Sequence, residues 1–215
     1  MKPSFAIIGC GRIAKRHAEQ VVKHGVLAAV CDIIPQKADE MAALYQARPY
    51  YSIEALLAHE PGLNVVSICT PNGLHATNAI QALEAGINVL CEKPLCTNSV
   101  DGDKMIAAAA SASKKLFVVK QNRYNPPVAF LKKLINNGML GKIYSFQINC
   151  FWNRPDGYYT DWKGKKDLDG GTLFTQFSHF IDLLYWLLGD VATVQTKAKN
   201  FAHATIEFED TGMVL

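Results

Sequence analysis

Short apolar runs alternate with longer amphipathic stretches over the first 120 residues. The runs at 5–8, 27–31, 65–69, 88–91 and 116–119 have the length and apolar character of buried strands. Helical spacing of apolar residues recurs between them, at about 12–24, 35–47, 52–59, 75–85 and 99–114. Strands that alternate with helices in this way are typical of repeated βαβ units. The pattern therefore predicts an α/β fold with a doubly wound parallel sheet.

The pattern changes after residue 122. A helix is expected at about 127–137, a strand at 142–151, and a second helix at 172–188 that is apolar almost all round and hence predicted to be buried. Strand patterns follow at 191–199 and 203–208, before a turn at 209–212 and a return strand from Met213. We therefore expect two domains, 1–122 and 123–215. Because the return strand has only three residues, we also expect the natural chain to continue past Leu215.

Composition and charge narrow the class of protein. With 49% apolar and 19% charged residues, the chain is neither a disordered tail, a coiled coil nor a collagen. No apolar run approaches the roughly 18 residues of a membrane span, and the N-terminus lacks the pattern of a signal peptide. We expect a cytoplasmic protein with no membrane partner. The net charge of +3 is spread along the chain, which gives no footprint for nucleic acid.

Cysteine and histidine spacing argues against two further kinds of site. The six cysteines show no C-x-x-C spacing and are expected to be reduced thiols in the core. The histidines show no H-x-x-x-H or H-E-x-x-H spacing, so no metal site is expected.

A glycine-rich turn lies between the first predicted strand and the first predicted helix. In the motif G-x-G-x-x-A, Gly9 permits a tight turn, Gly11 lets the backbone approach a pyrophosphate, and Ala14 allows close helix packing. Asp32 ends the second strand 23 residues after Gly9, where a carboxylate can bind adenosine ribose hydroxyls. Its charge would repel a 2′-phosphate, and Lys37 is the only cation nearby, so the sequence predicts NAD rather than NADP. A glycine turn without a nucleotide is the alternative.

Two tripeptides end later strands of the predicted sheet, Thr70-Pro71-Asn72 and Glu92-Lys93-Pro94. Ligands of an open parallel sheet bind outside the carboxyl ends of its strands, so both tripeptides should face the nicotinamide. A strand-end lysine that is partly desolvated beside this cationic ring would lose its proton more readily, which suits it to proton transfer. The alternative is a surface lysine in a turn.

Together these motifs resemble the Gfo/Idh/MocA family of oxidoreductases. The residues that carry the resemblance follow the family's order: the glycine motif with His17-Ala18, Thr70-Pro71-Asn72 with His75-Ala76, Glu92-Lys93-Pro94, and Gly170-Gly171 ahead of His179 and Asp182. The resemblance implies an N-terminal Rossmann domain and a second domain of open, mostly antiparallel sheet. It also implies a full length above about 300 residues and a homo-oligomer, dimer or tetramer.

The resemblance further implies roles for individual residues. It places Lys93 and His179 at the reacting carbon, with a Lys93–Pro94 peptide that is commonly cis, while Thr175 stands where many members have Asp. The residues expected to bind the cofactor are Gly9, Gly11, Arg12, Ile13, Asp32, Thr70, Asn72, His75, Glu92, Lys93, Asn122 and Trp162. Those expected to bind the substrate are Lys93, Arg154, Tyr158, Tyr159, Gln176 and His179.

Several assignments stay open at this point. Arg154 is the one guanidinium in the loop before the last predicted helix, so it can pair with a substrate carboxylate or phosphate, or be a solvated loop residue. His17 and His75 have a packing role as readily as a cofactor contact.

The segment 151–182 is most similar to family members that oxidise C3 of UDP-N-acetylglucosaminuronic acid for bacterial surface polysaccharides. NAD-dependent oxidation of this sugar nucleotide is therefore the leading expectation. The alternatives are a dehydrogenase of another sugar or of inositol, and a non-catalytic NAD-binding regulator.

Overall fold

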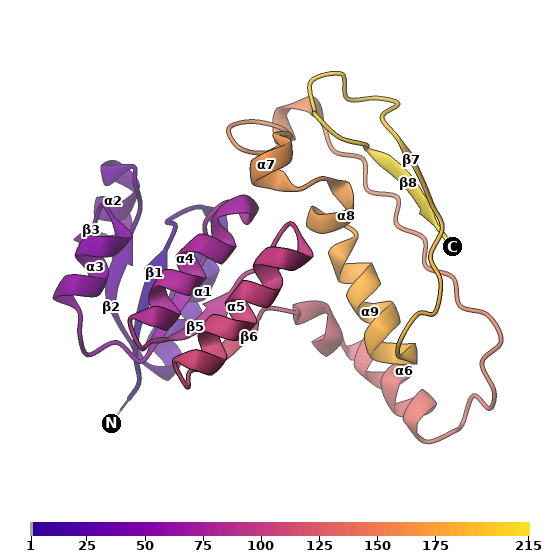
Figure 1. Cartoon of the computed structure of the whole chain (residues 1–215), viewed down its shortest axis with the longest axis horizontal. Helices are drawn as coiled ribbons and strands as arrows, with labels where there is room; N and C mark the ends of the chain where they lie inside the picture. The colour runs from indigo at the N-terminus through magenta and orange to yellow at the C-terminus, as the bar shows by residue number, and fades with distance from the viewer. Residues whose placement is uncertain (1) are drawn as a thin grey trace. The chain divides into compact units, whose positions relative to one another are not determined.

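The computed structural model describes residues 2–215 and divides them into two compact units (Figure 1). Unit 1 extends to Val119, and unit 2 begins at Lys120. Each unit is described here by itself.

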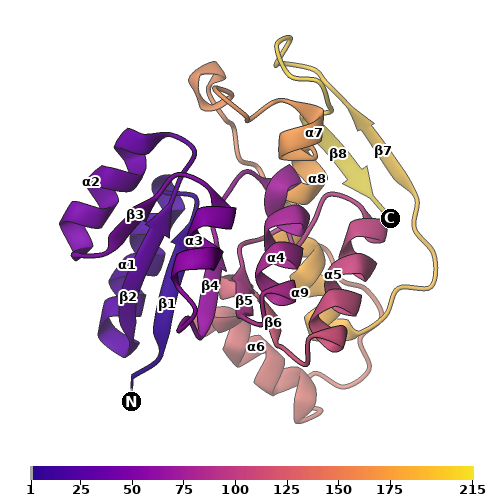
Figure 2. The same cartoon turned by 60° about the vertical axis from the view of Figure 1, so that its left-hand side comes forward.

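Unit 1 is built on one sheet of six parallel strands (Figure 2). In chain order they are β1 (Ser4–Ile8), β2 (Val26–Cys31), β3 (Arg48–Tyr50), β4 (Val65–Ile68), β5 (Asn88–Cys91) and β6 (Leu116–Val118). Their order across the sheet is β3-β2-β1-β4-β5-β6, so the winding direction reverses between β1 and β4. This order defines the doubly wound sheet of dinucleotide-binding proteins, and it confirms the predicted fold class.

Five helices cover the two faces of this sheet. They are α1 (Arg12–His24), α2 (Pro35–Tyr45), α3 (Ile53–His59), α4 (His75–Glu84) and α5 (Ser99–Ser111), with the short 3-10 helix η1 (Asn72–Leu74) before α4. Side chains alternate along β1: Ala6 and Ile8 pack in a cluster with residues of α3, α4 and α5, whereas Ile7 packs with residues of α1 and α2. Because both faces are covered, the strands carry near-continuous apolar residues.

Local side-chain signals start most of these helices. The Ser52 hydroxyl accepts the Ala55 N–H at 3.2 Å and caps α3, and the Asn98 side chain accepts the Asp101 N–H at 2.9 Å and caps α5. Pro35 occupies the first turn of α2.

The strand β3 was not predicted. It has only three residues, with Pro49 in the middle, and it occupies the edge of the sheet. Proline is rare inside strands, so these residues gave no strand signal. An edge strand tolerates proline because one side of it needs no ladder partner.

Unit 2 contains short helices and one antiparallel strand pair (Figure 1). Its elements are η2 (Gln121–Tyr124), α6 (Pro126–Asn136), η3 (Asp156–Tyr158), α7 (Lys166–Asp169), α8 (Thr172–Thr175), α9 (Ser178–Leu188), β7 (Thr196–Lys199) and β8 (Thr211–Val214). The β7–β8 ladder is extended by mutual backbone hydrogen bonds between Gln195 and Leu215 at 2.7 and 2.8 Å.

Three sequence predictions for unit 2 are wrong. Residues 142–151 are irregular although their pattern alternates, because a strand requires a partner and none of the described residues pairs with them. Residues 203–208 form turns, and the hairpin instead pairs β7 with β8. The expected helix 172–188 is divided into α8 and α9, with residues 176–177 between them.

The expected helix at 172–188 was predicted to be buried, and its main part, α9, is only partly buried. His179, Leu183 and Leu187 are buried, whereas Ile181 and Tyr185 are about half exposed. Residues four apart share one side of a helix, so one stripe of α9 is buried and another is exposed.

Other expectations concern thiols, metals and membranes. All six cysteines are free, and four of them are buried. Burial, aided by the charge of Asp32, raises the pKa of both the Cys10 and the Cys31 thiols to about 12. Among residues 2–215, no three His, Cys, Asp or Glu side chains gather as metal ligands would. Over the same residues, none of the helices has the length and apolar character that crossing a membrane requires.

Candidate functional site

The first glycine of the motif is fixed by a close backbone approach. Gly9 follows β1 with φ of +91°, and a side-chain carbon at this position would lie 2.7 Å from backbone atoms of the Cys69-Thr70 peptide that follows β4. A Cβ atom at that distance overlaps the neighbouring peptide, so only glycine fits. The loop after β1 is thereby held against the end of β4, at the point where the sheet reverses its winding.

The second glycine borders open space. A Cβ atom at Gly11 would meet nothing within 4 Å, and among the described residues no side chain caps α1, which begins at Arg12 and Ile13. The N–H groups of the first turn of a helix have no partner within the helix, and they attract anions. The arrangement fits the pyrophosphate of a dinucleotide.

Asp32 lies directly after β2 and faces the glycine loop. Its Oδ2 accepts the Cys10 N–H at 2.8 Å, and its Oδ1 accepts the Ile34 N–H at 2.9 Å. Each carboxylate oxygen has two lone pairs, so these bonds fix the side chain and leave capacity for ribose hydroxyls. Lys37, the one cation considered near it in the sequence, is exposed on α2.

His75 joins the two tripeptides that end β4 and β5. The ring is 1% exposed, with Nδ1 2.6 Å from the Pro94 carbonyl oxygen and Nε2 3.0 Å from the Thr70 carbonyl oxygen. Asn78, one turn further along α4, donates to the Thr70 hydroxyl at 3.0 Å. Of the two roles left open for His75, the contacts support the packing role, in which one buried ring holds both loops.

Glu92 is likewise bound within the protein. Its Oε1 lies 2.8 Å from His17 Nε2, and its Oε2 accepts the Lys93 N–H at 3.1 Å. His17 Nδ1 lies 3.1 Å from the Ser67 hydroxyl of β4. Burial raises the pKa of Glu92, but the hydrogen bonds and charges of His17 and Lys93 together outweigh it, and the net shift is downward. These contacts link α1 and β4 to Glu92, the residue that follows β5 and precedes Lys93.

Lys93 itself is half-buried, between buried Glu92 and buried Pro94, and the Lys93–Pro94 peptide is cis, as the family resemblance implied. Asn72 is buried in η1, the short helix that follows Thr70-Pro71. Both residues lie beyond the carboxyl ends of β4 and β5, where an open parallel sheet binds its ligand.

In unit 2, three of the predicted substrate residues form one connected group. A guanidinium nitrogen (Nη2) of Arg154 donates to the Gln176 side-chain oxygen at 2.9 Å, and the Gln176 amide donates to the Tyr158 hydroxyl at 3.0 Å. The guanidinium also lies over the rings of Tyr158 and Trp152, 4.6 and 5.3 Å from their centroids. Its Nε is buried and has no hydrogen-bond partner among residues 2–215. A buried donor without a hydrogen-bond partner fits an anionic ligand, which can accept its hydrogen bond.

The remaining predicted residues of unit 2 lie outside this connected group. Tyr159 packs edge-to-face against His203, at 4.9 Å, and against Tyr158. Trp162 is half-buried, and Asn122 lies half-buried in η2. His179 is buried in the first turn of α9.

Sequence reasoning missed four residues of these groups: Ser67, Asn78, Trp152 and Ser178. Ser67 and Asn78 contact His17 and Thr70, and Trp152 stacks on Arg154. The Ser178 hydroxyl, next to His179, is buried with no hydrogen-bond partner in the described part of the chain. Trp152 and Ser178 lay in the segment 151–182 that the sequence had marked, whereas Ser67 and Asn78 carried no signal beyond their place in a predicted strand and a predicted helix.

Comparison with protein families identifies the class. Residues 4–120 match the family described as "Oxidoreductase family, NAD-binding Rossmann fold", and residues 128–215 match the "GFO/IDH/MocA C-terminal domain". The chain belongs to the Gfo/Idh/MocA family of NAD-binding oxidoreductases.

Two solved structures are similar over almost the whole chain. They are the WlbA dehydrogenases of Chromobacterium violaceum (42% identity, TM-score 0.95, 99% of this chain and 63% of that one) and of Bordetella pertussis (40%, 0.95, 100% and 67%), each in complex with NADH and UDP-GlcNAcA. Among curated proteins, the D-glucoside 3-dehydrogenase of Escherichia coli is 31% identical over 201 residues, which cover 91% of this chain and 57% of that protein. The chain spans about half the length of the curated relatives it matches.

Proposed function

We propose that this chain carries the NAD site and the substrate site of a dehydrogenase that oxidises C3 of UDP-N-acetylglucosaminuronic acid to a 3-keto sugar. The observation that carries the proposal is the likeness, at TM-score 0.95 and 40–42% identity, to two dehydrogenases in complex with NADH and UDP-GlcNAcA. Unit 1 is the cofactor part and unit 2 the substrate part of the proposal.

The residues of unit 1 fit NAD on their own geometry. The open space at Gly11 and the uncapped start of α1 suit the pyrophosphate, and the Asp32 carboxylate suits ribose hydroxyls and disfavours a 2′-phosphate. When bound, NAD supplies the hydride acceptor for the oxidised carbon. Thr70, Asn72 and Lys93 then border the nicotinamide end.

Proton transfer is assigned to Lys93 and His179. One of them accepts the proton of the C3 hydroxyl, and the other donates a hydrogen bond to the same oxygen. The contacts of Glu92 and His75 hold the loop of Lys93 in place, and the first turn of α9 holds His179. Most of the affinity for NAD is assigned to the glycine loop and Asp32, so loss of either proton-transfer group should leave NAD binding largely intact.

Arg154 is assigned to the anionic part of the substrate. Its guanidinium is stacked between Trp152 and Tyr158, and it retains a buried donor, Nε, with no partner among the described residues. A planar guanidinium pairs with a carboxylate or a phosphate through two parallel hydrogen bonds. UDP-N-acetylglucosaminuronic acid carries both groups, and the neutral glucosides and inositols named for other relatives do not.

Two substitutions test the chemistry. Lys93→Met or His179→Asn should lower kcat by roughly 10²–10⁴-fold, the usual range for general acid–base catalysis, with little change in the Kd of NAD. Because both groups act on one oxygen, the double variant should lose less than the product of the two single losses. Lys23→Met and His24→Asn, exposed at the end of α1, are the matched controls.

The substrate panel comprises UDP-N-acetylglucosaminuronic acid, UDP-N-acetylglucosamine, a D-glucoside and myo-inositol. Preference for a neutral sugar would show that the chain acts on another member of the family's substrate range. If both single variants keep near-normal turnover on the preferred compound, the mechanism is wrong and a non-catalytic NAD-binding regulator explains the chain better.

A further inference from the structure

The segment between β7 and β8 folds back onto the loop that carries the substrate residues. The Glu207 N–H donates to the Gly164 carbonyl oxygen at 2.9 Å, and the Thr172 hydroxyl donates to the Glu209 carbonyl oxygen at 2.6 Å. Ile206 is buried against Gly164, whose φ of +87° lets the chain turn there. All these residues belong to unit 2.

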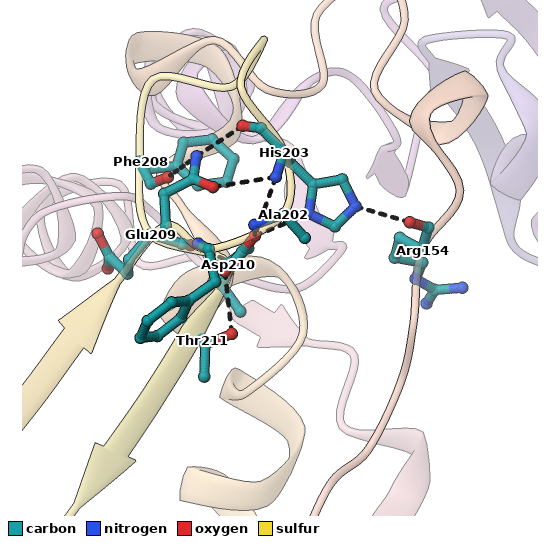
Figure 3. A network of polar contacts seen from close by, with 10 residues as sticks. Arg154, Ala202, His203, Phe208, Glu209, Asp210 and Thr211 are labelled. Atoms are coloured by element: carbon teal, nitrogen blue, oxygen red, sulfur yellow. Dashed lines mark hydrogen bonds and ion pairs between the residues drawn. The ribbon is translucent and has the colours of Figure 1, made fainter.

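His203 lies at the centre of this contact (Figure 3). Its ring is buried, with Nδ1 2.9 Å from Asp210 Oδ2 and Nε2 2.7 Å from the carbonyl oxygen of Arg154. A carboxylate oxygen and a carbonyl oxygen both accept hydrogen bonds and cannot donate them. Only the imidazolium form, which carries a proton on each nitrogen, makes both bonds.

Asp210 is held in its ionised form by the surrounding backbone. Its two oxygens accept the N–H groups of Phe201 at 3.0 Å and Ala202 at 2.8 Å, and the Thr211 hydroxyl at 2.9 Å (Figure 3). Burial works to raise the pKa of Asp210, but these bonds and that from His203 outweigh it and hold the pKa well below its usual range.

The charged and titratable groups around His203 are the carboxylates of Asp210 and Asp156, the ring of Tyr159, and Arg154, whose carbonyl it binds. The two carboxylates and the carbonyl favour the cation of His203. The hydrogen bonds to Arg154 and Asp210 raise the pKa of His203, against the opposing effect of burial.

The backbone around the Arg154 carbonyl is not held by regular secondary structure. Residues 151–155 have no regular secondary structure, so no helix or strand ladder sets the backbone of Arg154. Its side chain, by contrast, is ordered by Gln176 and by the rings of Trp152 and Tyr158. The ion pair of His203 and Asp210 is the link that ties this backbone to the β7–β8 segment.

We propose that His203, clamped by Asp210, is a positioning residue that holds Arg154 in place for an anionic group of the substrate, a carboxylate or a diphosphate. The inference rests on the proposed function of Arg154. It predicts that losing the proton of His203 weakens substrate binding without slowing proton transfer, because His203 acts through Arg154 rather than on the reacting carbon.

The pH dependence has a definite sign. Because the pKa of His203 is raised, its imidazolium persists above its ordinary value of 6.5 and is lost only as the pH rises through the raised value. Over that interval the substrate carboxylate stays ionised. The Kd of UDP-N-acetylglucosaminuronic acid should therefore be constant at lower pH and should rise on the alkaline side.

The experiment compares four variants of the full-length enzyme: His203→Gln, Asp210→Asn, Arg154→Gln and, as a matched control, His24→Gln on the exposed end of α1. We expect His203→Gln and Asp210→Asn to raise the KM and Kd for the sugar nucleotide about 10-fold, the lower end for a lost hydrogen bond to a charged group. The kcat should stay within about 3-fold, and the Kd of NAD should not change. The alkaline rise in Kd should be present in the wild type and absent in His203→Gln.

A double variant separates this inference from the proposed function. His203→Gln added to Arg154→Gln should weaken binding no further, since the first acts through the second. If Arg154→Gln weakens binding but His203→Gln does not, the positioning role is overturned and the proposed function stands. If Arg154→Gln has no effect, both the assignment of Arg154 and the inference fail, whereas the Lys93 and His179 variants still test the reaction.

Two further measurements keep the test decisive. Should His203→Gln fail to fold, the wild-type profile of Kd against pH and an NMR titration of the His203 ring test the inference instead. A ring that titrates below pH 6.5 overturns it. UDP-N-acetylglucosamine lacks the carboxylate, so a smaller effect of His203→Gln on this compound supports a carboxylate contact, and an equal effect supports a diphosphate contact.

Discussion

At the scale of single residues, the two glycines of the motif serve different physical purposes. Gly9 is required by its positive φ and by the Cys69-Thr70 peptide 2.7 Å from its missing Cβ. Gly11 has an ordinary φ of −75° and open space around it, so folding does not require a glycine there. Its small size matters only when a ligand approaches the backbone.

Substitution by alanine should therefore separate stability from binding. Gly9→Ala should lower the free energy of unfolding by about 2–4 kcal/mol, from strain and overlap together. Gly11→Ala should change it by less than about 0.5 kcal/mol and should weaken NAD binding. Denaturant unfolding and NAD titration measure the two effects, and equal destabilisation by both variants would contradict this reading of the loop.

Asp32 gives the second prediction at this scale. Asp32→Ala should weaken NAD binding by roughly 10–100-fold, the range for hydrogen bonds to a charged group, because ribose hydroxyls lose their acceptor. NADP should lose less, since removal of the carboxylate also removes its repulsion of the 2′-phosphate. Titration of both cofactors measures the ratio, and an equal loss would remove Asp32 from its assigned role.

At the scale of elements, two histidines, one half-buried and one buried, connect the parts of the cofactor domain. His17 links α1 to Glu92 at the end of β5, and His75 links α4 to the loops after β4 and β5. Both are polar groups inside a packed domain, so their contacts stabilise it only while every partner is present. The loop of Lys93 depends on both links.

Glu92→Gln tests one of these links through its pH dependence. The pKa of Glu92 is lowered below its ordinary value of 4.5 in the folded chain, so its contribution is complete above about pH 4.5 and is lost as the pH falls through the lowered value. We expect the variant to cost about 1–3 kcal/mol at pH 7, and this difference from wild type should shrink below pH 4.5. Glu19→Gln, exposed on α1, is the control and should show no such trend.

At the scale of the whole molecule, the two units differ in their cores. Unit 1 has an apolar cluster on each face of its sheet. In unit 2, the buried apolar side chains among the described residues are Leu183, Leu187 and Ile206. Buried apolar area is the main source of stability, so the two units should not open together.

Hydrogen exchange checks this difference. Amides of β1, β4 and β5 should exchange at least about 10-fold more slowly than those of α9 and the β7–β8 pair, since only the former lie in a sheet covered on both faces. NAD at 100 times its Kd should stabilise unit 1 by about 2.7 kcal/mol and slow exchange there. The same exchange rates in both units would show one cooperative unit and contradict the expectation.

Much of unit 1 was determined by the sequence itself. Buried parallel strands are apolar along their whole length, amphipathic helices keep their spacing, and Gly, Pro, Ser and Asn mark the ends, so five of the six strands and the glycine loop were predicted near their observed positions. The motifs likewise led to the family. These signals are local, because each depends only on a few residues that are neighbours along the chain.

Only the tertiary structure decided the rest. Residues 142–151 have the pattern of a strand but no partner among the described residues, and β3 is a strand solely because β2 lies beside it. The partners of His17, His75 and His203 lie 75, 19 and 49 residues away along the chain. Pairing and side-chain contacts at such separations are set by how the elements pack. A period or a motif describes only neighbouring residues, so neither predicts such contacts.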